Sequence, residues 1–410
     1  MNTTPQQLRP MFLFGSYTSP MPKVENITSE ILNGDYHFHG DNRIYTQPNP
    51  SKTKYDERDS GVISLTLDTL KNHIKDLKVS EDVNYEEIAY IVSKLKKQSG
   101  TNRDPTLQAF RDVLFTELKT KFSKKFELTL FGRDTSTTPS KITLDNVISS
   151  TWTWIMWIVF EQLIDRNKQH SPKALRDFFD VMLDSSKIPT ICTLNHDTKT
   201  EQALGSYPYV DGFSSFTSGT AKFHPSLLKS REGQIPLLKL HGSINWFYKD
   251  GEYIKLANPD DYDETNCVFE PLFLAGSLNK LEDYSYLMFP WIWTEFQNQL
   301  LQTKRIICSG YGFMDLGVTS RLREWLSLID GAKLLIIDPD PEKLVRSCQR
   351  HDINNIGSFF GERESQTKYT ICVDSTKIQD TSHSIIFLKC GFEDASKHAK
   401  ALRTFVYGTT

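Results

Sequence analysis

Residues 236–246, PLLKLHGSINW, carry the pattern on which the prediction of the fold depends. An apolar run with the character of a β-strand ends at His241, a Gly-Ser turn follows, and a second apolar run with an aromatic residue begins directly afterwards. Glycine beside a histidine lets backbone or ligand approach closely, so the pattern is typical of an imidazole held at the lip of a cleft. The alternative interpretation is a turn histidine bonded to a nearby carbonyl group.

Two further apolar runs end in polar turns in the same way. Residues 191–198, ICTLNHDT, end in Asn195 and Asp197, and residues 305–315, RIICSGYGFMD, run into a glycine-rich turn. In this order the three motifs resemble those of the sirtuin superfamily. The forms His-Gly-Ser-Ile-Asn-Trp and Gly-Tyr-x-Phe-x-Asp are typical of its bacterial antiviral-defence branch, which destroys NAD+. The resemblance is specific over about residues 185 to 345.

Strand-like and helical patterns alternate along this part of the chain. Repeated strand-then-helix units predict a parallel sheet whose ligand site lies at the carboxyl ends of the strands. We therefore expect an α/β fold with a Rossmann-like, doubly wound parallel sheet and an inserted, mainly helical subdomain. Strands are expected at 11–14, 190–194, 237–240, 305–308, 333–337, 369–373 and 384–389, and helices at 143–166, 171–186, 291–303, 318–329 and 395–405.

The first expected strand runs into a glycine turn that is predicted to bind phosphate. A strand, a glycine turn and a helix form the usual phosphate cradle, because the N–H groups at the start of the helix point at the anion. The sirtuin resemblance implies contacts with NAD+ from Gly15, Ser16 and Ser19, where the family reads Gly-Ala-Gly-x-Ser. Tyr17 stands in place of the second glycine. An ordinary turn between strand and loop is the alternative.

The inserted subdomain is predicted from helical periodicity over residues 63–130. The resemblance implies that residues 1–34 form the first strand and phosphate loop, residues 35–145 a loop and a helical insertion, and residues 146–410 the remainder of the Rossmann domain. Loops are expected at 36–61, as a flap over the site, and at 205–235 and 271–274, and a hairpin is expected at 246–254.

Composition indicates an ordinary globular protein without resident metal. The chain has 410 residues, a net charge of −3 and no general attraction for nucleic acid or anionic membrane. Its six cysteines include no Cys-x-x-Cys pair, so we expect no zinc ribbon and no structural zinc. His37 and His39 lack the further ligands that a metal needs. No signal peptide opens the chain, and residues 147–160 are expected to form a core helix, so we expect a cytoplasmic protein without membrane contact.

The sirtuin resemblance implies cleavage of the bond between nicotinamide and ribose. The amide of Asn195 would hold a water beside the anomeric carbon. His241 would act as the general base, accepting a proton from that water or from a ribose hydroxyl. Asp197 would bond ribose hydroxyls or hold the turn. An Asx turn that caps the next helix is the alternative for both Asn195 and Asp197.

The remaining candidate residues would bind the other end of the dinucleotide. The resemblance implies that Gly310 and Tyr311 pass close to the adenosine side. Asp338 resembles the acidic residue that binds ribose hydroxyls in dinucleotide folds. A plain turn is the alternative for Asp338, and Asp315 is expected to cap the following helix rather than contact ligand.

These expectations favour an NAD+ glycohydrolase of anti-phage defence, with NAD+ as its substrate. A protein deacylase is disfavoured by the missing zinc ribbon and by the aromatic-rich loop at 205–235. A nucleotide-sensing or nucleic-acid-associated subunit of a defence complex is the other alternative, and Tyr17 favours it. The family resemblance implies a homo-oligomer and a partner ATPase, helicase or nuclease, with nucleic acid contacted only indirectly or weakly.

Overall fold

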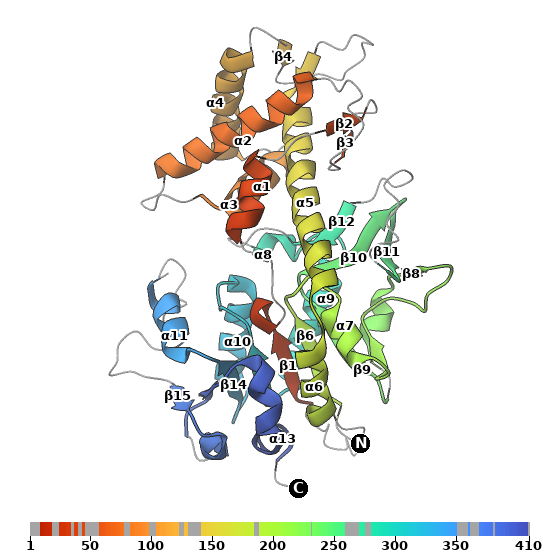
Figure 1. Ribbon diagram of the computed structural model, residues 1–410, viewed down its shortest axis with the longest axis vertical. Helices are drawn as coiled ribbons and strands as arrows, with labels where there is room; N and C mark the ends of the chain where they lie inside the picture. The colour runs from red at the N-terminus through yellow and green to blue at the C-terminus, as the bar shows by residue number, and fades with distance from the viewer. Residues whose placement is uncertain are drawn as a thin grey trace. The chain divides into compact units, whose positions relative to one another are not determined.

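The structure is a computed structural model, and its described residues form two compact units (Figure 1). Unit 1 comprises Met1–Met21, Leu163–Leu274 and Asn279–Thr410, and unit 2 comprises Pro22–Gln162 and Ala275–Leu278. The expected insertion, 35–145, lies within unit 2, and its boundaries stay a prediction. The described residues are 9–18, 24–33, 37–39, 43–45, 57–77, 83–97, 104–122, 127–129, 141–183, 188–230, 232–258, 270–274, 280–350, 360, 369–379 and 382–408.

Unit 1 is built on an eight-stranded parallel sheet in the order β15-β16-β14-β13-β1-β6-β9-β7. On one side of β1 the sheet continues with β6 and then β9. The later strands β13, β14 and β16 lie in that order on the other side of β1. The predicted Rossmann-like, doubly wound α/β fold is therefore confirmed. The strands are β1 (Met11–Phe14), β6 (Thr190–Thr193), β7 (Tyr209–Val210), β9 (Ile235–Lys239), β13 (Arg305–Ser309), β14 (Lys333–Asp338), β15 (Tyr369–Cys372) and β16 (Ile385–Lys389).

The central strand β1 is apolar throughout because it is buried on both faces. Its four residues are fully buried, and they pair with β6 on one side and with β13 on the other. Side chains alternate between the faces of a strand, so Met11 and Leu13 join one hydrophobic core while Phe12 and Phe14 join the other. A continuous apolar run is what a strand covered by helices on both faces requires.

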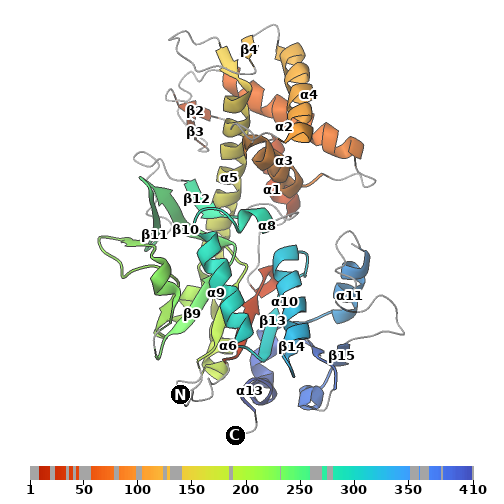
Figure 2. The same cartoon turned by 180° about the vertical axis from the view of Figure 1, so that it is seen from behind.

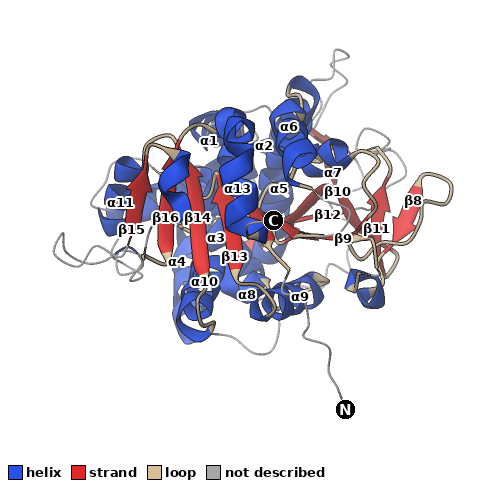
Figure 3. Ribbon diagram, turned by 90° about the horizontal axis from the view of Figure 1, so that it is seen from below, coloured by secondary structure: helices blue, strands red, loops and turns tan. Residues whose placement is uncertain are grey.

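Helices cover both faces of this sheet (Figure 3). On one face, α6 (Lys173–Met182) and α13 (Ala399–Tyr407) pack Phe178 and Leu402 into the core with Phe12 and Phe14. On the other, α9 (Phe289–Leu301) and α10 (Leu316–Leu328) lie in front of the sheet in Figure 2. Among the described residues of unit 1, three α-helices were not predicted, namely α7 (Lys199–Leu204), α8 (Lys280–Asp283) and α11 (Pro341–Arg350).

A second, antiparallel sheet contains β10, which begins at Gly242 within the His241 motif, and its strand order is β12-β10-β11-β8. The predicted hairpin is confirmed, and Asp250 and Gly251 in its turn both have the positive φ of a two-residue hairpin turn. The prediction that 205–235 and 271–274 are only loops is wrong, because β7, β8 and β12 lie there. Strands of two or three residues, such as β7 and β8, show no clear alternation in sequence, and Pro271 argues against a strand at β12. The sheet comprises β8 (Thr220–Lys222), β10 (Gly242–Lys249), β11 (Glu252–Leu256) and β12 (Glu270–Phe273).

Unit 2 is mainly helical, as predicted. Its core buries Arg111, whose guanidinium donates to Asp145 Oδ1 at 2.5 Å and to the Leu95 carbonyl at 3.0 Å. The loop predicted at 36–61 contains two short strands, and the side chains of His37 and His39 lie outside the described residues. The elements are α1 (Val24–Asn33), β2 (His37–His39), β3 (Arg43–Tyr45), α2 (Glu57–Leu77), α3 (Tyr85–Lys97), α4 (Pro105–Phe122), β4 (Glu127–Thr129), β5 (Lys141–Thr143) and the first part of α5 (Leu144–Gln169).

Helix α5 contains the apolar segment expected at 147–160. Among the described residues it is the one helix whose length and composition are sufficient to cross a membrane, and 56% of its most apolar window is buried in the structure. Trp154 and Ile155 are both almost fully buried. The core helix of a globular protein can have the same length, composition and burial.

Candidate active site at the carboxyl edge of the sheet

The predicted site residues follow the carboxyl ends of neighbouring parallel strands. Gly15 follows β1, Asn195 follows β6 and His241 follows β9, while Gly310 follows β13 and Asp338 ends β14. These five residues therefore lie along one edge of the main sheet, as expected. The direction of strand addition reverses between β1 and β13, and ligands of doubly wound sheets bind at such a point.

Gly15 allows β1 and β13 to approach each other closely at this point. Its N–H donates to the Ser309 carbonyl at 2.9 Å. A Cβ at position 15 would lie 2.7 Å from the carbonyl carbon of Gly310 and against its oxygen, so no larger residue fits without movement. Gly310 has a φ of +70°, in the left-handed region that favours glycine.

The turn after β1 is closed by Thr18. Its N–H and its hydroxyl both donate to the Gly15 carbonyl, at 3.1 and 2.7 Å, within a short 3₁₀ turn (Ser16–Thr18). Ser16 is exposed, whereas Ser19 and the side chain of Tyr17 lie outside the described residues. The sequence predicts a phosphate contact for the Thr18 hydroxyl, together with those of Ser16 and Ser19, whereas its contact with a distant strand was not predicted.

That contact positions Asn195. The amide nitrogen of Asn195 donates to Thr18 Oγ1 at 3.1 Å, and the side chain is 2% exposed. Its amide oxygen is buried and has no hydrogen-bond partner among the described residues. A buried acceptor without a partner is unfavourable, so a ligand hydroxyl or a water that donates to it is stabilised there.

Asp197 forms an Asx turn, which is the alternative to a contact with ribose hydroxyls. Its Oδ1 accepts the N–H of Lys199 at 2.9 Å at the start of α7. The ammonium of Lys239, which is fully buried, donates to the Asp197 carbonyl and to Glu201 Oε1, the latter at 2.9 Å. The contacts of Asp197 among the described residues therefore hold the turn in place.

His241 is the centre of a buried polar network. Its Nε2 lies 2.7 Å from Asp315 Oδ2 and 3.0 Å from the Tyr284 hydroxyl, which itself donates to Asp315 Oδ2 at 2.7 Å. Its Nδ1 lies 3.2 Å from Lys280 Nζ. The next residue, Gly242, has a φ of +80° and packs against the Leu272 carbonyl, so a side chain there would collide with β12.

The electrostatics of this network favour a neutral imidazole beside an ionised carboxylate. Burial and the ammonium of Lys280 lower the pKa of His241 to about 4, although Asp315 acts in the opposite direction. Burial acts to raise the pKa of Asp315, but its bonds to His241 and Tyr284 and the charge of Lys280 hold that pKa well below its usual range. Burial and the neighbouring Asp315 raise the pKa of Tyr284 well above its ordinary value.

Asp315 has two roles, of which only one was predicted. Its Oδ1 accepts the N–H of Val318 at 3.2 Å, so it caps α10 as expected. Its Oδ2 holds His241, and this contact was not predicted. The parts that Lys280 and Tyr284 play in the same network were not predicted either. The four-residue helix α8 (Lys280–Asp283) presents Lys280, and Tyr284 follows it directly. A helix this short shows no periodicity in sequence, so no signal identified either residue.

The other predicted binding residues bond within their own turns. The Tyr311 hydroxyl donates to the Asp315 carbonyl at 2.8 Å and lies 2.7 Å from Thr319 Oγ1. Asp338 Oδ1 accepts the N–H of Asp340 at 2.7 Å, which is the plain-turn alternative. Neither arrangement tests whether these residues bind ligand, and both roles stay predictions.

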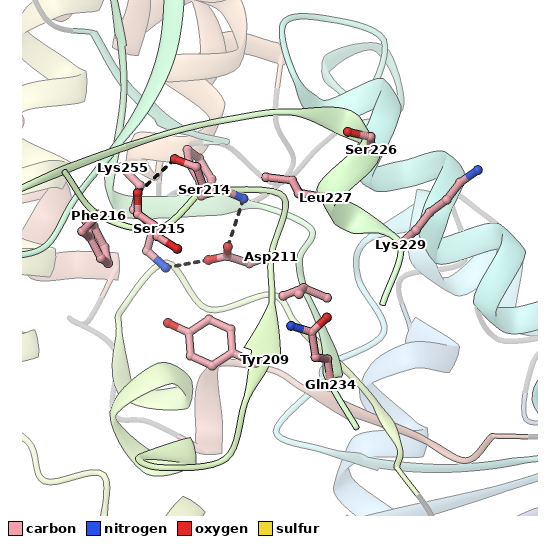
Figure 4. Close-up of a pocket in the computed structure, with 12 residues that line it drawn as sticks. Tyr209, Asp211, Ser214, Ser215, Phe216, Ser226, Leu227, Lys229, Gln234 and Lys255 are labelled. Atoms are coloured by element: carbon pink, nitrogen blue, oxygen red, sulfur yellow. Dashed lines mark hydrogen bonds and ion pairs between the residues drawn. The ribbon is translucent and has the colours of Figure 1, made fainter. Parts of the chain in front are cut away.

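Unit 1 also contains a cavity of about 450 Å³ away from these side chains (Figure 4). Lys255 donates to Asp211 Oδ2 at 2.5 Å, and its ammonium lies 5.4 to 6.0 Å from the ring centres of Tyr209, Phe213 and Phe216. The aromatic rings thus surround a cation that belongs to the chain itself. This buried ion pair ties the loop after β7 to β11.

Comparison with known proteins supports the resemblance read from the motifs. Residues 189–357 match the SIR2-like domain model. This match supports the sirtuin resemblance predicted for the segment, while the antiviral branch stays a proposal. The matched residues include Asn195, His241 and Asp315, whereas Gly15 and Thr18 precede the SIR2-like segment. No curated protein matches the sequence significantly.

Several solved structures of Sir2 homologues are similar to the chain. A Sir2 homologue in complex with NAD is 11% identical with a TM-score of 0.35, covering 97% of this chain and 91% of that one. A mutant homologue in complex with 2'-O-acetyl ADP ribose is 12% identical with a TM-score of 0.32, covering 61% and 75%. Likeness at this level transfers no residue role to the SIR2-like segment.

Metal ligands do not gather in the described part of the chain. No three His, Cys, Asp or Glu side chains among the described residues are placed to hold a metal ion. The expected absence of zinc remains a prediction, because Cys267 lies outside the described residues.

Proposed function

We propose that the chain is an NAD+ glycohydrolase that cleaves NAD+ into nicotinamide and ADP-ribose. One observation carries the proposal, namely the hydrogen-bonded pair of His241 and Asp315 at the carboxyl edge of the sheet, where Asn195 follows the neighbouring strand β6. A buried carboxylate that holds a neutral imidazole in one orientation is the arrangement of a general base. The SIR2-like match over 189–357 supports NAD+ as the ligand.

The bond between nicotinamide and ribose breaks through a state with positive charge on the sugar, and a water then attacks the anomeric carbon. The unpartnered oxygen of Asn195 would accept a hydrogen bond from that water or from a ribose hydroxyl. Its amide nitrogen is already held by Thr18, so the oxygen is fixed in direction. Such positioning lowers the barrier because the reacting atoms need not be ordered during the reaction.

His241 would take the proton from the water or from the hydroxyl. Since Nε2 faces Asp315, the proton would arrive at Nδ1, and the carboxylate would stabilise the imidazolium that forms. The Tyr284 hydroxyl donates to the same carboxylate oxygen and holds it in place. Nicotinamide leaves as a neutral molecule, and the hydroxyl group of the water ends on the ribose of ADP-ribose.

The proposal is tested by incubating the purified protein with NAD+ and measuring free nicotinamide by chromatography. His241→Ala and Asn195→Ala are each expected to reduce turnover by at least about a hundredfold, the scale for removing an acid–base or positioning group. His224→Ala serves as a matched control, because His224 is an exposed histidine of unit 1. Near-normal turnover in folded His241→Ala protein would show that the assignment is wrong.

A nucleotide-sensing subunit is the second candidate function, and one contact favours it. Lys280 occupies Nδ1 of His241, the nitrogen that a general base needs. A protein that only senses NAD+ would bind it and release no nicotinamide. Calorimetry with NAD+ that shows binding, together with no nicotinamide release in the assay above, would select this function.

We also propose a biological setting on the basis of the family resemblance. The protein would act in the cytoplasm in anti-phage defence by depleting NAD+, as a homo-oligomer and beside a partner ATPase, helicase or nuclease. The measurement is the NAD+ content of infected cells that express the wild type or His241→Ala. A similar fall in NAD+ in both strains would contradict the proposal.

A further inference from the structure

The contacts of His241 decide which of its ring nitrogens is free for chemistry. Asp315 is a buried, ionised carboxylate, and its Oδ2 lies 2.7 Å from Nε2. A carboxylate only accepts hydrogen bonds, so Nε2 must carry the proton and Nδ1 must carry the lone pair. The basic nitrogen of His241 is therefore Nδ1.

Lys280 covers that nitrogen. Its ammonium lies 3.2 Å from Nδ1, and an ammonium group donates hydrogen bonds but accepts none. The lone pair is consequently used in a hydrogen bond, and a second proton on the ring would lie directly against a positive charge. Lys280 has to leave Nδ1 before His241 can act as a base.

The charges that face His241 from the elements packed around it are nearly balanced. Asp315, before α10, supplies the anion, and Lys280, on α8, supplies the cation. Tyr284 contributes a neutral hydroxyl, and the neighbouring ring of His196, 5.9 Å away, is kept neutral because burial and the charge of Lys280 lower its pKa well below the ordinary value. The Leu194 carbonyl also faces the ring as an acceptor, but a neutral imidazole carries a single N–H proton, and the charged carboxylate of Asp315 competes for it more strongly than a carbonyl does. A new anion near Lys280 would compete with His241 for its ammonium.

An NAD+ molecule carries such an anion in its diphosphate. The expected phosphate turn at Gly15 follows β1, and β9, which ends before His241, lies two strands away in the sheet. Two strand spacings are about 10 Å, so a diphosphate held between the two sites would lie within the reach of a lysine side chain. Lys280 is only half-buried, and His241 Nδ1 is the partner that its ammonium contacts from a helix of four residues, so a stronger anion can compete for it.

We propose that Lys280 is a positioning residue that senses the diphosphate of the substrate. In this structure its ammonium covers Nδ1 of His241; a bound diphosphate takes the ammonium, and Nδ1 then becomes free to accept a proton. This inference rests on the proposed function, since it names the substrate group that activates the same site. A nucleoside that has no phosphate is therefore expected to leave Lys280 on Nδ1 of His241, even when it is bound at the same edge of the sheet.

The contact is tested by following the titration of His241 by NMR in protein labelled on its histidines, with the signal assigned by its loss in His241→Gln. Wild-type His241 is expected to titrate near pH 4. Lys280→Met keeps the length of the side chain without its charge and is expected to move that titration toward the ordinary value of 6.5. Lys280→Arg is expected to keep it low, and Lys229→Met, at an exposed lysine of unit 1, is expected to leave it unchanged.

The diphosphate is tested in the same experiment with two ligands. ADP-ribose is expected to raise the pH at which wild-type His241 titrates, whereas adenosine, which has no phosphate, is expected to leave that pH unchanged. In kinetics, the acid limb of kcat, which reports the bound enzyme, should lie at higher pH than the acid limb of kcat/KM, which reports the free enzyme. In Lys280→Met the two limbs should coincide.

The outcomes separate this inference from the proposed function. Equal His241 titration in wild type and Lys280→Met would overturn the contact, whether or not the protein hydrolyses NAD+. An unchanged titration with saturating ADP-ribose would overturn the role of the diphosphate. If nicotinamide is released but Lys280→Met has no effect, the proposed function is supported and the role of Lys280 is wrong. If the titrations are as expected but no nicotinamide is released, the role of Lys280 is supported and the proposed function is wrong.

Discussion

At the scale of single residues, Asp315 allows the two roles of one side chain to be separated. Asn is as good a helix cap as Asp, so Asp315→Asn keeps the bond to the Val318 N–H. Its amide nitrogen, however, is a donor and would hold His241 with the proton on Nδ1 instead of Nε2. We expect a loss of turnover of at least about a hundredfold with an unchanged melting temperature. Asp315→Ala, the control, should lose both the turnover and the cap.

The lowered pKa of His241 also makes stability depend on pH. In the unfolded chain His241 takes up a proton at about pH 6.5, but in the folded chain only at about pH 4. The unfolded state therefore binds more protons between these values, and stability falls as the pH drops from 6.5 to 4. The part due to this residue is at most about 3 kcal/mol. Denaturant unfolding at pH 7 and pH 5 should show a smaller loss in His241→Gln than in wild type, and equal losses would contradict the lowered pKa.

At the scale of elements, the junction between β1 and β13 depends on Gly15. A methyl group there meets the backbone of Gly310 and Tyr311, which cannot rotate away. We expect Gly15→Ala to lower the free energy of unfolding by about 1 to 3 kcal/mol, the scale for overpacking a tight contact. The matched control is Gly312→Ala, because a Cβ at position 312 meets nothing within 4 Å. Equal denaturation midpoints for the two variants would show that the junction is not tight.

The length and residue pattern of each element explain which parts of the fold could be predicted from sequence. The parallel strands of four or more residues were found because each is a continuous apolar run, and the strand ends located His241, Asn195 and Gly15 with them. Strand β12 was missed because Pro271 argues against a strand, and the two or three residues of β7 and β8 and the single turn of α8 left no signal. Lys280 and Tyr284 were missed for that reason. The bond between Thr18 and Asn195 was missed because the two residues are distant in sequence, and no local pattern encodes such a contact.

At the scale of the whole molecule, activity is expected to be conditional. An enzyme that hydrolysed NAD+ continuously would kill the cell that makes it, and the contact of Lys280 with His241 occupies the base within a single chain. We therefore expect a homo-oligomer whose turnover rises on assembly or on contact with a partner. Light scattering combined with the nicotinamide assay measures both quantities. A monomer with full activity and no partner would contradict this expectation.

The position of β1 in the sheet has a consequence for how the chain folds. Met11 pairs with Thr190 on one side and with Ile306 on the other, so both partners of β1 lie far along the chain and are made after it. Neither pairing can form early, because closing such long loops is entropically unfavourable and unit 2 is synthesised in between. The apolar segment Met11–Phe14 therefore waits, unpaired, until β6 and β13 have emerged. During that interval it is a natural site for chaperone binding and, without it, for aggregation.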